Sequence, residues 1–202
     1  MTKLQKKSLV FLSILCLCLT ALSPMALAQE EKMEIRFTGN AIGMSGPATG
    51  KTGRLTMVIN HWTTDLETKK LYETLMEGGN KALLKSMRER EVGYVAYTGT
   101  LRWPLNVARM FKMEDGKILV RLVTNRPIMW WEIARATSRS RDYEFGYIEF
   151  TLEEEKNKGE GYLIHTAKID LTPEGKVSIE TLGTNPHRLQ NVKQIIPKEK
   201  KK

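Results

Sequence analysis

One stretch of the chain concentrates the aromatic and basic side chains that bind apolar ligands and anions. Residues 124–145 hold two of the four tryptophans of the sequence, Trp130 and Trp131. The same stretch carries four arginines, which are Arg126, Arg135, Arg139 and Arg141. Indole rings line apolar pockets, and guanidinium groups form charge-assisted hydrogen bonds with carboxylates and phosphates. We therefore predict a non-catalytic binding site, to which Trp103 and His61 also contribute, for a small apolar, amphipathic or anionic ligand or for a cell-envelope partner.

A structural role explains the same residues without a ligand. If Trp130 and Trp131 are extended, their rings point to opposite faces and only one reaches a core; in a short helix starting at Pro127 they lie about 100° apart. Trp103 precedes Pro104, which favours an extended or turning backbone. The tryptophans therefore either fill the core, seal the end of a barrel or line a pocket, and the arginines either bind an anion or form a solvated loop.

The histidines give only a weak indication of catalysis. His61, His165 and His187 show no H-x-H or H-x-x-x-H spacing, and both cysteines lie before residue 29, so we predict no metal and no cofactor. His165 falls on the apolar side of a predicted strand, which favours a buried, hydrogen-bonded ring. His61 follows a strand, beside Trp62, at a position where sites gather. The alternative hypothesis is therefore a periplasmic hydrolase or isomerase in which His61 acts with a nearby carboxylate.

The segment 45–52 is similar to a phosphate-binding loop in composition only. Gly46 lies one residue too close to Gly50, Pro47 lacks an amide donor, and a strand pattern follows where a helix is required. We interpret it as a glycine-rich connection between two strands.

The N-terminus indicates export. Three lysines, an apolar run over residues 8–22 and the small residues of 26–28 are typical of a secretory signal peptide. We predict that residues 1–28 are removed, that the protein is periplasmic or secreted, and that no transmembrane segment remains. Residues 29–196 are predicted to form one β-rich domain, and 197–202 a basic disordered tail.

The charge of the chain excludes one class of partner. The formal net charge is +9, but three cations belong to the signal peptide and others to the C-terminal lysines. The predicted domain is only mildly basic, so we predict no nucleic-acid partner. The basic loop around Arg139 and the lysine tail leave a third hypothesis, docking on an anionic lipid or polymer of the cell envelope.

Alternation of apolar and polar residues predicts the fold. It indicates eight strands, over 33–39, 54–62, 93–98, 105–113, 117–124, 145–152, 162–171 and 176–182. Residues 189–196 fit either a last strand or a helical turn. The capping box Thr64–Glu67, a stop at Gly78–Gly79 and a second cap at Asn80 predict two helices within 64–90.

The predicted fold class is mainly β (α+β). We expect an antiparallel meander of about eight strands that forms a barrel or a strongly curved sheet, because closure removes exposed edges. The two helices are inserted between the second and third strands. Strand count and size resemble those of lipocalin-like barrels, as an analogy of architecture without a lipocalin sequence motif.

Overall fold

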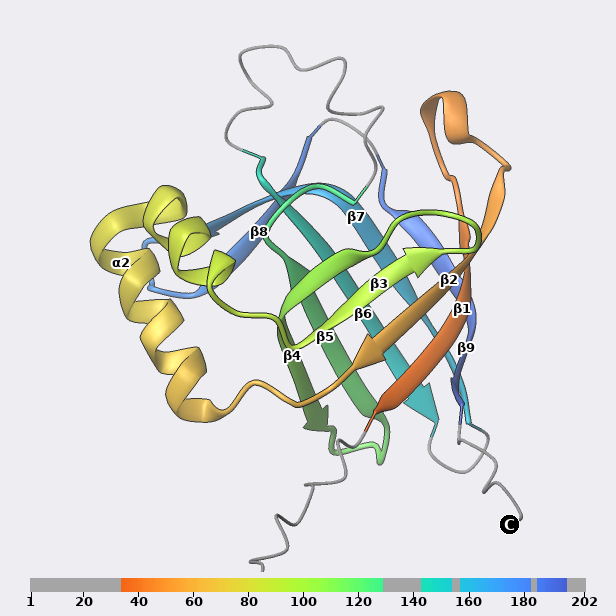
Figure 1. Cartoon of the computed structure of the whole chain (residues 1–202), viewed down its shortest axis with the longest axis horizontal. Coiled ribbons are helices and arrows are strands. Elements are labelled where there is room, and N and C mark those ends of the chain that lie inside the picture. The colour runs from red at the N-terminus through yellow and green to blue at the C-terminus, as the bar shows by residue number, and fades with distance from the viewer. Residues whose placement is uncertain (1–33, 129–142, 154–156, 183–184, 196–202) are drawn as a thin grey trace, which may run out of the picture. The chain divides into compact units, whose positions relative to one another are not determined.

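A computed structural model of the chain describes residues 34–128, 143–153, 157–182 and 185–195 (Figure 1). The predicted signal peptide and the lysine tail lie outside these residues. The chain divides into Met1–Lys32 and a second compact unit, Met33–Lys202. No helix in the described ranges is both long and apolar enough to cross a membrane.

Eight antiparallel strands close into a barrel, which confirms the coarse prediction (Figure 1). The described elements contain nine strands: β1 (Ile35–Ile42), β2 (Thr52–Ile59), β3 (Gly93–Tyr97), β4 (Trp103–Lys112), β5 (Ile118–Thr124), β6 (Phe145–Glu153), β7 (Lys158–Leu171), β8 (Val177–Thr181) and β9 (His187–Ile195). Strands β1 to β7 pair in sequence order, and β9 lies between β7 and β1.

The order of the last strands differs from a simple meander. Strand β7 is 14 residues long. Its first part pairs with β9 from Gly159 to Leu163, and its second part pairs with β8 from Ala167 to Leu171. The strand that completes the barrel is therefore β9, and β8 extends β7 outside it. Of the two structures that fit the sequence near the C-terminus, a strand and a helical turn, the strand forms, as β9.

The barrel interior holds one hydrophobic core. Its largest fully buried side chains include Phe150, Leu55, Met57, Leu122 and Ile148. Phe37 meets Phe150 across the barrel in an edge-to-face contact, with ring centroids 5.2 Å apart. Strand period places these residues on one face, and closure of the sheet brings them together.

The helical insertion is one element, α2 (Asp65–Arg88), where we predicted two separate helices. Thr64 and Glu67 form the predicted capping box. The helical backbone is interrupted at a single residue, Gly79, with φ +63° and ψ −162°. Because glycine adopts this conformation without a Cβ clash, the chain resumes the helix at Asn80 and the element is kinked.

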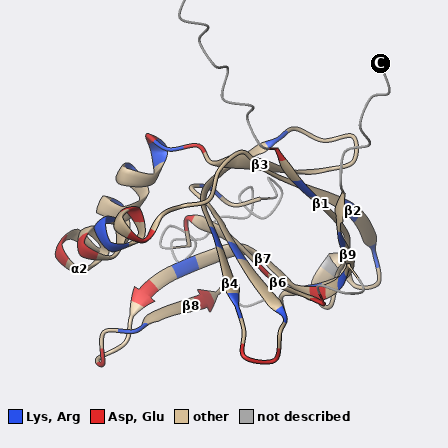
Figure 2. Cartoon of the chain, turned by 90° about the horizontal axis from the view of Figure 1, so that it is seen from below, with Lys and Arg blue, Asp and Glu red and all other residues tan. Residues whose placement is uncertain are grey.

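Helix α2 covers part of the outer face of the barrel. Its buried residues contact Phe145, Tyr147, Ile164, Ala167 and Ile169 in a second hydrophobic cluster; from the helix these are Leu71, Leu75, Leu83, Leu84 and Met87. Acidic and basic residues lie along the rest of the helix (Figure 2). This amphipathic pattern fixes which side faces the sheet.

A buried asparagine joins the end of α2 to the barrel. The pairing of β4 with β5 shifts register between Leu105 and Val107, and this irregularity leaves Asn106 only 1% exposed. Its side-chain amide donates to the carbonyl oxygens of Met87 (2.9 Å) and Arg90, and its Oδ1 accepts from the amide of Asn125 (2.7 Å). These bonds tie the backbone at the end of α2 and the backbone after β5 to one buried side chain of β4.

Candidate functional site

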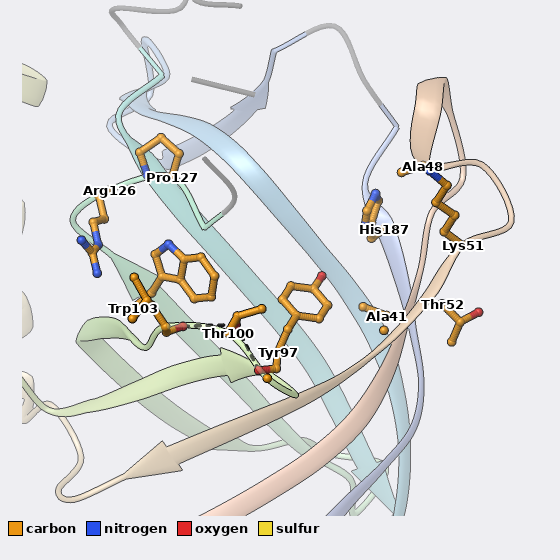
Figure 3. Close-up of a pocket in the computed structure, with 13 residues that line it drawn as sticks. Ala41, Ala48, Lys51, Thr52, Tyr97, Thr100, Trp103, Arg126, Pro127 and His187 are labelled. Carbon is orange, nitrogen blue, oxygen red and sulfur yellow. Dashed lines mark hydrogen bonds between the residues drawn. The ribbon is translucent and has the colours of Figure 1, made fainter. Parts of the chain in front are cut away.

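A pocket of about 690 Å³ lies at the end of the barrel where β3 ends and β4 begins (Figure 3). We call this end the mouth. The pocket is lined by apolar, aromatic and basic side chains, among them Lys51, Tyr97, Leu101, Trp103, Arg126 and His187. Lys51, Leu101 and Arg126 come from three connections between strands, and Tyr97, Trp103 and His187 from the ends of β3, β4 and β9. Concave sites of about 300–1,000 Å³ with apolar walls and a few polar groups are typical of small-molecule binding.

The pocket forms because the side chains that point into the barrel become smaller towards the mouth. Along the β1–β2 pair, Phe37 lies opposite Met57, and two residues nearer the mouth Gly39 lies opposite Leu55. The last inward pair is Ala41 and Gly53. Small residues at this level leave space that larger residues fill below, so the cavity is confined to the mouth.

Gly53 also sets the position of the Tyr97 ring. A Cβ added at Gly53 would lie 2.8 Å from two atoms of that ring. Such a contact is too short for carbon atoms, so the ring rests directly on the glycine backbone. Tyr97 is thereby held at the pocket wall beside Trp103 (Figure 3).

Tyr97 contacts the buried ring of His165, which in turn contacts His187. His165 is 6% exposed, and its Nε2 lies 3.3 Å from the Tyr97 hydroxyl. The His187 ring meets His165 edge to face at 4.1 Å between centroids. Burial, together with the neighbouring His187, lowers the pKa of His165 to about 3, and burial also lowers the pKa of His187. Both rings are therefore uncharged at neutral pH.

Arg126 is placed by a buried anchor on each side. The buried Thr124 hydroxyl donates to the carbonyl oxygen of Arg126 (2.6 Å) and accepts from the Gly146 amide (3.0 Å). Ile128 is fully buried, and its amide donates to the His165 carbonyl (3.1 Å). The guanidinium itself donates to the carbonyl oxygen of Arg102 (2.9 Å). The backbone at Arg126 is thus fixed, while the side chain remains exposed.

Lys51 stands across the pocket on the β1–β2 connection (Figure 3). A short 3₁₀ turn, Gly46–Ala48, and left-handed backbone at Gly46 (φ +64°) and Gly50 (φ +73°) fold this connection back on itself. The Gly43 amide donates to the Lys51 carbonyl at 2.9 Å. The glycine pattern of this segment therefore serves a tight turn, in agreement with our interpretation of it as a connection between strands.

The pocket has a positive rim and apolar walls. Its described lining contains no aspartate or glutamate, and its only charged side chains in those ranges are Lys51 and Arg126. Neither cation forms an ion pair with a described carboxylate. Both therefore keep their charge available to a ligand.

The structure brings together only some of the residues predicted to form a site. Trp103 and Arg126 both line the pocket, and Trp103 also packs on the core. The predicted site residues Trp130, Trp131, Arg135, Arg139 and Arg141 lie outside the described residues. Sequence reasoning missed Tyr97 because it stands in an ordinary strand pattern, and missed His187 because its position after Pro186 indicates a solvated turn, whereas it begins β9 and packs on His165. Lys51 was treated only as part of a false phosphate loop.

His61 lies at the opposite end of the barrel, just after β2. It is exposed, and its ring has no hydrogen-bond or ion-pair partner among the described residues. The pairing with a carboxylate that the hydrolase or isomerase hypothesis needs is therefore not found in this part of the chain. Within the same ranges, no three His, Cys, Asp or Glu side chains gather as metal ligands would. The predicted burial and hydrogen bonding of His165 are confirmed.

A carboxylate with three hydrogen-bond donors, Glu149, lies on the outer face of the barrel. Glu149 accepts from Arg121 (2.6 Å), Tyr147 (2.6 Å) and Tyr162 (3.0 Å). Burial alone would raise the pKa of Glu149, but these donors outweigh it and lower the pKa. Burial and the bond to Glu149 raise the pKa of Tyr162 to about 12. The group resembles a satisfied structural network, and all partners of the carboxylate belong to the barrel wall.

Compared with known proteins, the chain matches no family model, no curated protein and no solved structure.

Proposed function

We propose that this protein binds a small amphipathic anion in the mouth pocket, without catalysing a reaction on it. The observation that carries the proposal is the pairing of apolar walls with two cations and no described acid in one cavity. Trp103, Tyr97 and Leu101 supply the apolar surface, and Lys51 with Arg126 supplies positive charge on either side (Figure 3). An apolar body and an anionic group match these two parts.

The geometry favours a defined orientation. The interior below the mouth is filled by the core, so a ligand enters only to the depth of Ala41 and Gly53. Its apolar part then lies against Trp103 and Tyr97, while its anionic end reaches the exposed cations. The neutral His187 offers a hydrogen bond without adding charge.

Binding of dodecanoate to residues 33–202 tests the proposal. This unit contains every described strand and the whole barrel core, so it is suited to study without the N-terminal segment. Titration calorimetry compares dodecanoate with dodecanol and with dodecyltrimethylammonium. We expect dodecanoate to bind most tightly, because only it complements both the walls and the cations.

Variants then assign the binding to the pocket. Arg126→Gln and Lys51→Gln should each weaken dodecanoate about fivefold, since an exposed ion pair contributes up to about 1 kcal/mol. Trp103→Ala should weaken dodecanoate and dodecanol alike, because it removes wall rather than charge. Lys112→Gln, a cation at the other end of β4, is the matched control and should leave affinity unchanged. Equal affinity for all three amphiphiles, or equal effects of Lys112→Gln and Arg126→Gln, would refute the proposal.

A further inference from the structure

The rim of the mouth combines exposed apolar side chains with cations that form no ion pair with a described carboxylate. Leu101, in the β3–β4 connection, is 85% exposed, and Met44, in the β1–β2 connection, is 49% exposed. These two connections border the same pocket from two sides. An exposed leucine alone is ordinary, but here two large apolar residues stand at the tips of neighbouring connections beside basic residues.

The described residues of this rim carry charge of one sign. Residues 43–51, 98–102 and 125–128 include the exposed cations Lys51, Arg102 and Arg126 and contain no aspartate or glutamate. The described acids at the same end belong to the β6–β7–β8 side, where Glu144, Asp170, Glu174 and Glu180 lie. The opposite end of the barrel differs, because its β4–β5 turn carries Glu114 and Asp115 (Figure 2).

We infer that the β1–β2 and β3–β4 connections dock this protein on the surface of an anionic lipid bilayer, with Met44 and Leu101 entering the headgroup region. Basic side chains are attracted to an anionic leaflet, and apolar tips gain by leaving water at the interface. A neutral membrane would not attract the basic side chains, and an acidic protein surface would not take up the apolar tips. The inference goes beyond ligand binding and does not depend on it, since Met44 and Arg102 do not line the pocket.

Vesicle flotation with residues 33–202 measures the docking. The probes are vesicles of phosphatidylcholine with about one third phosphatidylglycerol, and vesicles of phosphatidylcholine alone. The test variant is Met44→Ser with Arg102→Gln. The matched control at the far end of the barrel is Met113→Ser with Lys112→Gln, which also exchanges one exposed methionine and one cation.

We expect the test variant to bind anionic vesicles about tenfold more weakly than the unchanged protein, and the control to bind as the unchanged protein does. Both variants keep the C-terminal lysines. If the protein bound vesicles through that tail, both variants would therefore bind as tightly as the unchanged protein. Equal binding of the two variants, equal binding to both kinds of vesicle, or no binding of the unchanged protein would overturn the inference.

Fluorophore labelling gives an independent measurement of orientation. Residues 33–202 contain no cysteine, so Met44→Cys and Met113→Cys each provide one attachment point for an environment-sensitive dye. Anionic vesicles should shift the emission to the blue at position 44 and not at position 113; the opposite pattern would contradict the proposed face. Dodecanoate affinity of the Met44 and Arg102 variant, measured without vesicles, should be unchanged. Failure of dodecanoate binding with intact docking would therefore refute the proposed function alone.

Discussion

Replacement of His165 should remove a large part of the acid sensitivity of this fold. In the folded protein the ring is buried, and the titratable groups that face it are Tyr97 on β3 and His187 on β9. Its pKa falls from 6.5 to about 3 on folding. Between these values the unfolded chain binds a proton at this site and the folded chain does not, so stability decreases as the pH is lowered through 6.5.

The magnitude follows from the width of the pH interval. At pH 5 the ring lies about 1.5 pH units below its unfolded pKa and is still uncharged in the fold. At about 1.4 kcal/mol per unit, His165 alone reduces the free energy of unfolding by about 2 kcal/mol between pH 7.5 and pH 5. Carboxylates contribute little in this interval, since it lies above their usual pKa values.

Urea unfolding of residues 33–202 at the two pH values measures the effect. His165→Gln keeps a hydrogen-bonding side chain and cannot be protonated, so its loss of stability on acidification should be about 2 kcal/mol smaller than that of the unchanged protein. The comparison uses a difference between pH values, and a general destabilisation by the substitution therefore cancels. His61→Gln, at an exposed site, should keep the full loss. An unchanged pH dependence in His165→Gln would refute the assignment of a neutral buried ring.

Two further predictions concern the barrel wall. Asn106→Ala should lower the free energy of unfolding by about 3 kcal/mol, because three hydrogen bonds to buried backbone groups are lost at about 1 kcal/mol each; Asn40→Ala, without a described side-chain bond, should cost less than 1 kcal/mol in the same urea titration. Glu149→Gln should lower the pKa of Tyr162 from about 12, as followed by NMR of labelled tyrosine, and an unshifted titration would contradict the network.

Local patterns predicted the parts of the fold that depend on neighbouring residues. The capping box predicted at Thr64 forms, because it is decided within four residues. The strands predicted on either side of residues 114–116 are joined by an equally local turn, in which Gly116 takes φ +80° and the Met113 amide donates to the Lys117 carbonyl. The position of β9 between β7 and β1 depends on pairings across more than 20 residues, and no local signal encodes them. The burial of Asn106 depends on a register shift in β4, which reverses the alternation that we expected there.

The candidate site was less accessible to sequence reasoning for the same reason. Trp103 and Arg126 were predicted as site residues from their chemical types, and the structure places both at the mouth. The cavity depends on Ala41 and Gly53, two small residues without functional groups. Only the strand register, which sets them opposite each other, shows their importance. Lys51 and Arg126 line one pocket only because the fold brings the β1–β2 and β5–β6 connections to the same end of the barrel.

The filled core links the two proposals physically. Because large side chains occupy the barrel below Ala41 and Gly53, the mouth is the route by which a ligand reaches this pocket. The β1–β2 and β3–β4 connections that we infer to dock on a bilayer border that same opening. A protein docked in this way turns its pocket towards the lipid, so an amphipathic anion passes between membrane and pocket with little of its apolar surface crossing water. Anionic vesicles should then accelerate the transfer of dodecanoate from residues 33–202 more than neutral vesicles do. The Met44 and Arg102 variant should lose that acceleration while keeping its affinity.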